Sequence, residues 1–333
     1  MGCGCTSHCG KSSEELNEIN NEYTKTQIID IFSNDKKLLS SLIKIQSHYR
    51  GGKLREKLKF IDQNNQTAET IIVDEDELTT LLNTYPPLND NIHVEIISPI
   101  KYPTNYTKYY GEWDPSKNVR HGRGILVWSE GSKYSGYWVN DRVNIKGKLI
   151  HNNGDIYEGE WLDDKPNGKG IYYHKDGTIY EGDWKNDKQD GKGKEKWVDG
   201  TWYEGDYKNG KKHGKGKFFW ADGSTYEGSF ENNLISGEGV YIFGDKRKYE
   251  GSWANNKLDG YGVFTWPDGR KYIGNYKNDK KEGYGEFIWN DGKRYKGNWK
   301  KGNQDGEGEF YFPDLKKWKK GIWENGKRIK WIE

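Results

Sequence analysis

Cysteine is almost absent from this 333-residue chain, and its few positions are informative. All three cysteines, Cys3, Cys5 and Cys9, fall within the first ten residues. The rest of the chain therefore has no disulfide framework to support its fold, which indicates a reducing compartment.

Long apolar segments are also missing. No run approaches the ~18 apolar residues that a membrane-spanning helix needs. The N-terminus also lacks the apolar stretch of a secretory signal. We therefore expect an intracellular protein that does not cross a membrane.

Aliphatic residues are scarce, which disfavours an ordinary globular core. Hydrophobic residues make up 32% of the chain and aromatic residues alone 15%, and 43 glycines stand beside a single methionine. The formal net charge is +2, with an acidic first hundred residues and a mildly basic remainder. Since the lysines form no concentrated basic stripe, nucleic acid is disfavoured as a partner.

What the chain does have is a repeat. The pattern aromatic-x-Gly-x-aromatic recurs at steps that are mostly 23 residues. Nine units are complete, and the tenth lacks its leading tyrosine. A fixed period of this length is the signature of a repeat architecture. The central glycines are Gly111, Gly136, Gly159, Gly182, Gly205, Gly228, Gly251, Gly274, Gly297 and Gly321.

Each unit has the pattern of a β-hairpin. A Gly-x-Gly such as Gly214 and Gly216 is followed at alternate positions by rings, for example Phe218, and this period of two is typical of a strand with one apolar face. Between the two runs, an Asp-Gly pair such as Asp222-Gly223 predicts a two-residue turn. One repeat is therefore expected to be one hairpin.

A hairpin alone is marginal in water, so neighbouring hairpins must stack. We predict a mainly β fold, a single-layered antiparallel sheet of about eighteen strands over residues 99–333, with rings and glycines on one face and charges on the other. Because one layer has nothing behind it, the rings are expected to form an apolar groove that accepts a helix of a protein partner or of this chain. The rings assigned to this face are Tyr157, Trp161, Tyr180, Trp184, Tyr203, Tyr207, Phe218, Trp220, Tyr226, Phe230, Tyr249, Trp253, Tyr272, Tyr276, Tyr295 and Trp299.

The spacing of Tyr-x-Gly-x-Trp, Gly-x-Gly and Asp-Gly over residues 109–326 resembles the MORN repeat, and residues 98–113 resemble the lead-in strand of such arrays. The resemblance implies a scaffold that contacts membranes or partner proteins, with no chemistry of its own. Some units depart from the pattern. Ile145 stands where a glycine is expected, Glu195 replaces a ring, and Asp245-Lys246 replaces an Asp-Gly turn.

The first residues, Met1-Gly2-Cys3-Gly4-Cys5-Thr6-Ser7, fit the acceptor pattern for N-myristoylation at Gly2, with Cys3 and Cys5 available for palmitate. One acyl chain gives reversible membrane binding, and a second makes it stable. The alternatives are a metal cluster of the three cysteines with His8, or an inert tail. The cysteine spacing lacks the paired form of a zinc site, so dual acylation of residues 1–10 is favoured.

The leader, residues 11–98, is expected to be partly helical, with a short helix at Glu75–Leu82. Residues 45–55 resemble the calmodulin-binding IQ motif. A basic amphipathic helix suits an acidic, two-lobed partner such as calmodulin or a relative. The alternative is a helix that packs on the protein's own sheet. The motif positions are Ile45, Gln46, Arg50, Gly51 and Arg55.

We expect no enzymatic activity, no cofactor and no metal site. The leader is too short for a catalytic domain, the recurrent Gly-x-Gly is hairpin geometry rather than a phosphate loop, and the seven histidines form no metal spacing. His151 and His174 occupy a position filled elsewhere by Trp and are interpreted as ring substitutes.

Two functions remain. The favoured one is a scaffold tethered to the cytoplasmic face of a plasma, ciliary or cortical membrane, where it would belong to a cytoskeletal assembly such as that of a cilium. The other is a module that binds anionic lipids such as phosphoinositides. Lysines of the repeats are interleaved with Asp and Glu, which leaves little net field for anionic headgroups.

Overall fold

The computed structural model describes residues 75–101 and 107–332. The chain divides into two units, Met1–Thr70 and Ile71–Glu333, and the described residues belong to the second. The proposed acylation residues and the IQ motif lie outside the described residues.

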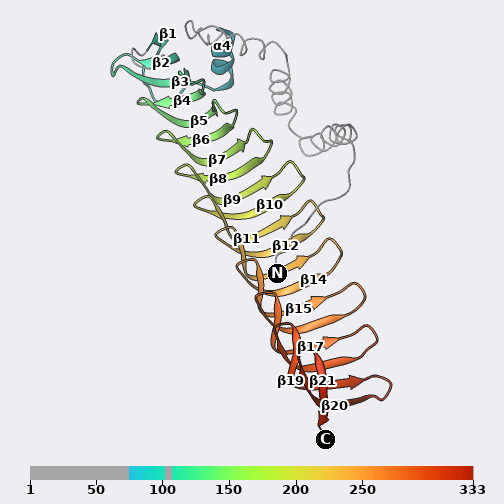
Figure 1. Cartoon of the computed structure of the whole chain (residues 1–333). Helices are drawn as coiled ribbons and strands as arrows, with labels where there is room; N and C mark the ends of the chain where they lie inside the picture. Colours follow the sequence, from blue (N-terminus) through green and yellow to red (C-terminus); the bar gives the residue numbers. More distant parts are fainter. Residues whose placement is uncertain (1–74, 102–106, 333) are drawn as a thin grey trace, which may run out of the picture. The chain divides into compact units, whose positions relative to one another are not determined.

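The second unit is one antiparallel sheet of 21 strands preceded by a short helix, so the predicted mainly β, single-layered fold is confirmed. Each strand pairs with the next strand in the sequence, and Figure 1 shows them stacked in chain order from β1 to β21. Three strands exceed the expected number. They are β1, which begins inside the segment assigned to the leader, and β20 and β21, which complete the partial tenth repeat.

The elements have the following bounds: α4 Glu75–Thr84, β1 Glu95–Lys101, β2 Lys108–Asp114, β3 Val119–Val127, β4 Lys133–Val139, β5 Arg142–Ile150, β6 Ile156–Leu162, β7 Lys165–Tyr173, β8 Ile179–Lys185, β9 Lys188–Lys196, β10 Trp202–Lys208, β11 Lys211–Phe219, β12 Thr225–Glu231, β13 Leu234–Ile242, β14 Lys248–Ala254, β15 Lys257–Thr265, β16 Lys271–Lys277, β17 Lys280–Ile288, β18 Arg294–Lys300, β19 Asn303–Phe312, β20 Lys317–Glu324 and β21 Lys327–Ile332. The helix expected at Glu75–Leu82 is therefore present and two residues longer.

The Asp-Gly pairs do not form two-residue turns, so that prediction was wrong. They lie in longer loops in which the Trp197 amide donates to the Thr201 carbonyl (2.9 Å) and the Gly200 amide donates to the Trp197 carbonyl (3.1 Å). The two-residue turns join the strands at the opposite edge of the ribbon. There, residues such as Asn186 (φ 48°) and Asp187 (φ 70°) are both left-handed, as a type I′ turn requires.

The tyrosine two residues before the central glycine of a repeat lies flat across a pair of glycines. Tyr203 is fully buried over Gly205 and Gly216, which face each other on β10 and β11. A Cβ atom at either glycine would come within 2.6 Å of the tyrosine ring or hydroxyl. The hydroxyl donates to the Asp206 carbonyl (2.9 Å), so the ring is fixed at both ends. The glycines are therefore needed for the close approach of the ring.

Beyond this glycine pair the two strands lose regular register. Gly205 faces Gly216, but Tyr207 faces Lys212, so extra residues of β11 form a bulge. The first glycine of the Gly-x-Gly, Gly214, has φ 67° in this bulge. In β5 the same place holds Ile145 with φ 64°, a conformation that a β-branched residue rarely adopts.

We predict that Ile145→Gly is more stable to urea than Ile145→Ala by about 1 kcal/mol, because alanine keeps the left-handed strain and glycine removes it. Both variants lose the same partly exposed side chain, which makes alanine the matched control. In an ordinary strand position the order is reversed, since glycine there is less stable than alanine. Equal urea midpoints, or a more stable alanine variant, would show that this position carries no strain.

Candidate functional site

The rings assigned to the aromatic face mostly form the core of the sheet. Tyr157, Tyr180, Tyr203, Tyr226, Tyr249, Tyr272 and Tyr295 are at most 1% exposed. The ring four residues later packs edge-on against each tyrosine. These rings are Trp161, Trp184, Tyr207, Phe230, Trp253, Tyr276 and Trp299, and all but the half-buried Trp184 are themselves buried.

Burial raises the pKa of the core tyrosine hydroxyls, to about 12 for Tyr226 and Tyr295, so these groups stay protonated donors at neutral pH. The expectation that Tyr203, Tyr226 and Phe230 lie on an open apolar face is therefore corrected. A single layer buries these rings because each tyrosine lies flat over two glycines and the ring four residues later packs edge-on against it.

Outside this core runs a second row of rings, which we call the aromatic ladder. Successive ring centroids lie 4.4 to 5.7 Å apart, so the row is continuous. Most of its members are partly exposed. The ladder consists of Trp197, Phe218, Trp220, Tyr241, Phe243, Phe264, Trp266, Phe287, Trp289, Phe310, Phe312 and Trp331.

Three irregular positions of this face have local explanations. His151 and His174 both contact Tyr172, with ring centroids 6.3 and 4.6 Å away, as expected for ring substitutes. Glu195 replaces a ring and binds the Lys212 ammonium (2.6 Å). It also accepts a hydrogen bond from the Tyr207 hydroxyl (2.9 Å), so its partly buried charge is compensated.

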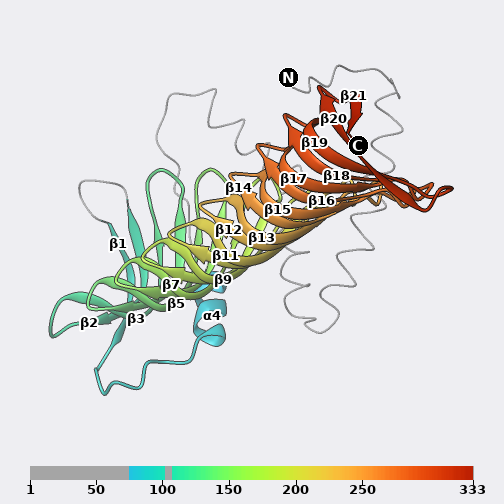
Figure 2. The ribbon, with the colours of Figure 1, turned by 90° about the horizontal axis from the view of Figure 1, so that it is seen from below.

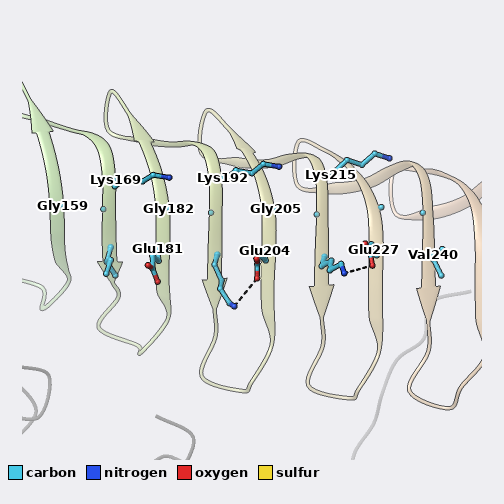
Figure 3. A pocket seen from close by; sticks show the side chains of 18 of the residues that line it. Gly159, Lys169, Glu181, Gly182, Lys192, Glu204, Gly205, Lys215, Glu227 and Val240 are labelled. Atoms are coloured by element: carbon cyan, nitrogen blue, oxygen red, sulfur yellow. Dashed lines mark ion pairs between the residues drawn. The ribbon is translucent and has the colours of Figure 1, made fainter. Parts of the chain in front are cut away.

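The opposite face carries an elongated groove of about 1850 Å³. It runs from β5 to β15, with glycine backbone along the strands and lysine and glutamate side chains beside it (Figure 3). Its lining residues are Thr84, Tyr85, Lys146, Gly147, Glu158, Gly159, Glu160, Lys169, Gly170, Ile171, Glu181, Gly182, Lys192, Gly193, Lys194, Glu204, Gly205, Lys215, Gly216, Lys217, Glu227, Gly228, Glu238, Gly239, Val240, Glu250, Gly251, Ser252, Tyr261 and Val263.

The charges of the groove compensate one another. Figure 3 shows Glu204 and Glu227 each paired with a lysine of the preceding strand, Lys194 (3.2 Å) and Lys217 (3.0 Å). The lining contains six lysines and seven glutamates, so the groove has almost no net charge. These pairs are more than half exposed, and each contributes about 1 kcal/mol or less to stability.

The polarity of this charge pattern reverses along the ribbon. In the middle repeats lysine stands on the odd-numbered strand and glutamate on the even-numbered one, as in Lys217–Glu227. In the last repeats the order is opposite: Glu286 on β17 lies near Lys296 on β18 (3.9 Å). Glu309 on β19 lies near Lys320 on β20 (3.8 Å). The central and C-terminal strands are therefore not interchangeable.

The groove face is already occupied at its N-terminal end by α4. Leu81 is buried against Ile125 and Val127 of β3, with Leu78 and Tyr85 packed beside them. Figure 2 shows α4 on one side of the sheet near β3. This part of the face is therefore apolar and covered by the helix.

Polar contacts hold the segment that follows α4. The Arg123 guanidinium donates to the carbonyls of Leu82 and Tyr85 (3.0 Å each) and pairs with Glu112, which raises the pKa of Arg123. The Tyr137 hydroxyl donates to the Pro86 carbonyl (2.6 Å). The face of the sheet thus binds polypeptide through its main chain as well as through apolar side chains.

A second anchor of this segment is buried. The imidazole of His121 is almost fully buried and lies 2.6 Å from the Asp90 carboxylate, and this hydrogen bond lowers the pKa of Asp90. Sequence reasoning missed His121, Arg123 and Tyr137. The available signal was that Tyr137 stands where later repeats carry a charged or small polar residue, such as Asp206 or Ser229.

The other end of the groove is open and carries exposed rings. Tyr261 and Tyr284 are 59% and 61% exposed, and Val240 and Val263 line the groove beside Tyr261. Exposed tyrosines on a sheet face are unusual here, since the other tyrosines of the strands are at least partly buried. This end combines large exposed rings with aliphatic side chains, as interaction surfaces do.

Within residues 75–101 and 107–332, no cluster of His, Cys, Asp and Glu could hold a metal ion. In the same part of the chain, no helix is long and apolar enough to span a bilayer.

The architecture is that of a repeat protein in which each hairpin contacts only its neighbours. The family model described as "MORN repeat" matches eight segments that together cover more than half of the chain, and the chain belongs to this family. Such an array is a repeat scaffold or a membrane-binding module, and its fold is typically non-enzymatic. The matched segments are 109–133, 157–179, 180–202, 203–225, 226–246, 249–269, 272–294 and 295–315.

The model skips residues 134–156, which include Ile145. No curated protein matches the chain. Among solved structures, the TCP10 domain of CPAP from Danio rerio is similar at 14% identity over 63% of this chain and 99% of that chain, with a TM-score of 0.35. The SAS-4 TCP domain of Drosophila melanogaster, solved with a proline-rich motif of Ana2, is similar at 10% identity over 54% and 97%, with a TM-score of 0.31. These scores carry no argument about function.

Proposed function

We propose that this chain is a non-enzymatic scaffold that holds segments of protein partners in the groove of its sheet. In this proposal the N-terminal acyl chains tether it to the cytoplasmic face of a membrane, and the IQ motif recruits calmodulin or a relative. The observation that carries the groove's role is the docking of α4 and the residues after it on the same face. The open end, with Tyr261 and Tyr284, offers a partner the same kind of contacts.

The alternative, an anionic-lipid module, has less support. A surface that collects anionic headgroups needs a net positive field. The lining of the groove is close to neutral, and its lysines already face carboxylates on neighbouring strands. A protein segment, in contrast, gains from exposed rings and from paired charges at the rim.

We predict that a photo-reactive benzoylphenylalanine in place of Tyr261 crosslinks to a protein in the cell that makes this chain. The matched control carries the same group at Val198, which is 69% exposed but lies in an Asp-Gly loop outside the groove. Protein adducts should be enriched at position 261. Lipid adducts at 261 would favour the alternative, and equal yields at the two positions would remove the groove from the proposal.

For the tether, Gly2→Ala is expected to move the full-length protein from the membrane fraction to the soluble fraction, because it removes the myristate acceptor. The purified variant should also fail to float with phosphoinositide vesicles. Cys3→Ser with Cys5→Ser should weaken retention less completely. Membrane fractionation that Gly2→Ala leaves unchanged would contradict the tether, and salt-sensitive flotation would favour lipid binding by the repeats.

For the IQ motif, a peptide spanning residues 36–61 is expected to bind calmodulin in titration calorimetry, and Ile45→Ala with Gln46→Ala should weaken binding at least tenfold. The apolar and polar positions of the motif would fill the grooves and meet the carboxylates of the partner. Titrations with and without calcium are both needed. The absence of heat in both conditions would leave residues 45–55 without this role.

A further inference from the structure

One lysine lies among the rings of the aromatic face without a carboxylate. Lys281 faces Tyr276 across β16 and β17. In several other repeats the equivalent position opposite the second ring holds an apolar residue, as at Ile235 and Leu258, or an uncharged amide, as at Gln189. Cations occupy the same position at Arg120 opposite Trp113 and at Lys212 opposite Tyr207, and both are paired with a carboxylate.

The ammonium group of Lys281 is surrounded by four rings. Its Nζ lies 4.7 Å from the ring centroids of Phe287 and Trp299, 5.1 Å from that of Tyr272 and 5.7 Å from that of Trp266. Among the described residues, no carboxylate or hydrogen-bond acceptor is paired with this Nζ. The ring faces stabilise the cation in part, but they do not replace the water it has lost.

Lys212 provides an internal comparison. It occupies the equivalent position opposite Tyr207 and lies over three rings, those of Trp197, Tyr203 and Tyr207, at 4.8 to 5.6 Å. Its Nζ is 2.6 Å from the Glu195 carboxylate. In the repeat of Lys281, the position equivalent to Glu195 is Phe264. The two lysines thus share two equivalent ring contacts, Trp197 and Tyr203 for Lys212 and Trp266 and Tyr272 for Lys281, and differ in the countercharge.

We propose that Lys281 is a selective acylation site of the array, at which the ε-amine takes an acyl group from a thioester donor. The amine nitrogen attacks the thioester carbonyl, the new N–C bond forms as the C–S bond breaks, and the amine proton leaves with the thiol. The product is a neutral amide, which removes an unpaired cation from among the rings. No oxidant or reductant is involved.

The electrostatic surroundings favour the reactive form. Burial lowers the pKa of Lys281 from 10.5 to about 8, and the nearby Arg270 guanidinium adds to this shift. The other titratable groups packed against it are the hydroxyls of Tyr272 and Tyr276, whose pKa values burial raises, so they stay neutral. At pH 8 about half of the Lys281 amines are thus unprotonated, against well under 1% of an ordinary lysine.

The test is acetylation of the full-length protein by acetyl-CoA at pH 7 to 10, with the initial rate at each lysine measured by peptide mass spectrometry. Nucleophilicity falls as the pKa falls, as it does for thiols, so a net advantage of about tenfold for Lys281 over Lys212 is expected at pH 8. The Lys281 rate should level off above about pH 8, whereas the rates of exposed lysines keep rising.

Two substitutions, one that adds a carboxylate beside Lys281 and one that removes the carboxylate beside Lys212, supply matched variants. Phe264→Glu places a carboxylate beside Lys281 and should lower its rate toward that of Lys212. Glu195→Gln, which keeps the shape of the side chain, should raise the Lys212 rate without changing the Lys281 rate. Circular dichroism checks that each variant is folded. Should Phe264→Glu fail to fold, Glu195→Gln and the pH profile decide alone. The proposal would be overturned if wild-type Lys281 reacted no faster than Lys212, or if its rate did not level off above about pH 8.

Discussion

The contact on which the rest of the structure depends is a tyrosine ring lying flat over two facing glycines. It buries a large ring without a second layer, because the space that two Cβ atoms would fill is taken by the ring itself. The hydroxyl reaches the carbonyl three residues later, and the next ring along the strand packs edge-on against the first. Each hairpin thus carries a small core that is completed by its neighbours, which explains how a chain poor in aliphatic residues forms an ordered sheet.

That contact also divides the two faces of the sheet by role. The aromatic face mainly holds neighbouring hairpins together, since its tyrosines are inaccessible to solvent. The other face keeps its side chains free for contacts and has a groove along the line of glycines. The partner surface that we propose is therefore the one opposite to the face that the sequence suggested, and α4 shows how a polypeptide segment lies there.

The repeat period, the hairpin unit, the shared face of rings and glycines and the short helix could all be predicted from the sequence, because each depends on local spacing. The turn assignment failed because Asn-Asp and Asp-Gly are both turn-forming pairs, and only the pairing of the strands shows which one closes in two residues. The burial of Tyr203 was also missed, because spacing gives the side of a strand that a ring occupies but not its inclination. His121 and Asp90 are far apart in the sequence, so no local pattern could join them.

Near-identical repeats carry a risk of misassembly, in which a strand pairs with the right kind of neighbour from the wrong repeat. The reversed charge order described above opposes this. If β11 paired with β18 in place of β12, Lys217 would stand opposite Lys296, and two like charges would face each other across the ladder. The individual ion pairs add little to stability. Their order along the ribbon nevertheless distinguishes the central hairpins from the C-terminal ones during folding. In a protein assembled from copies of one motif, differences between the copies can thus specify which strands pair with each other.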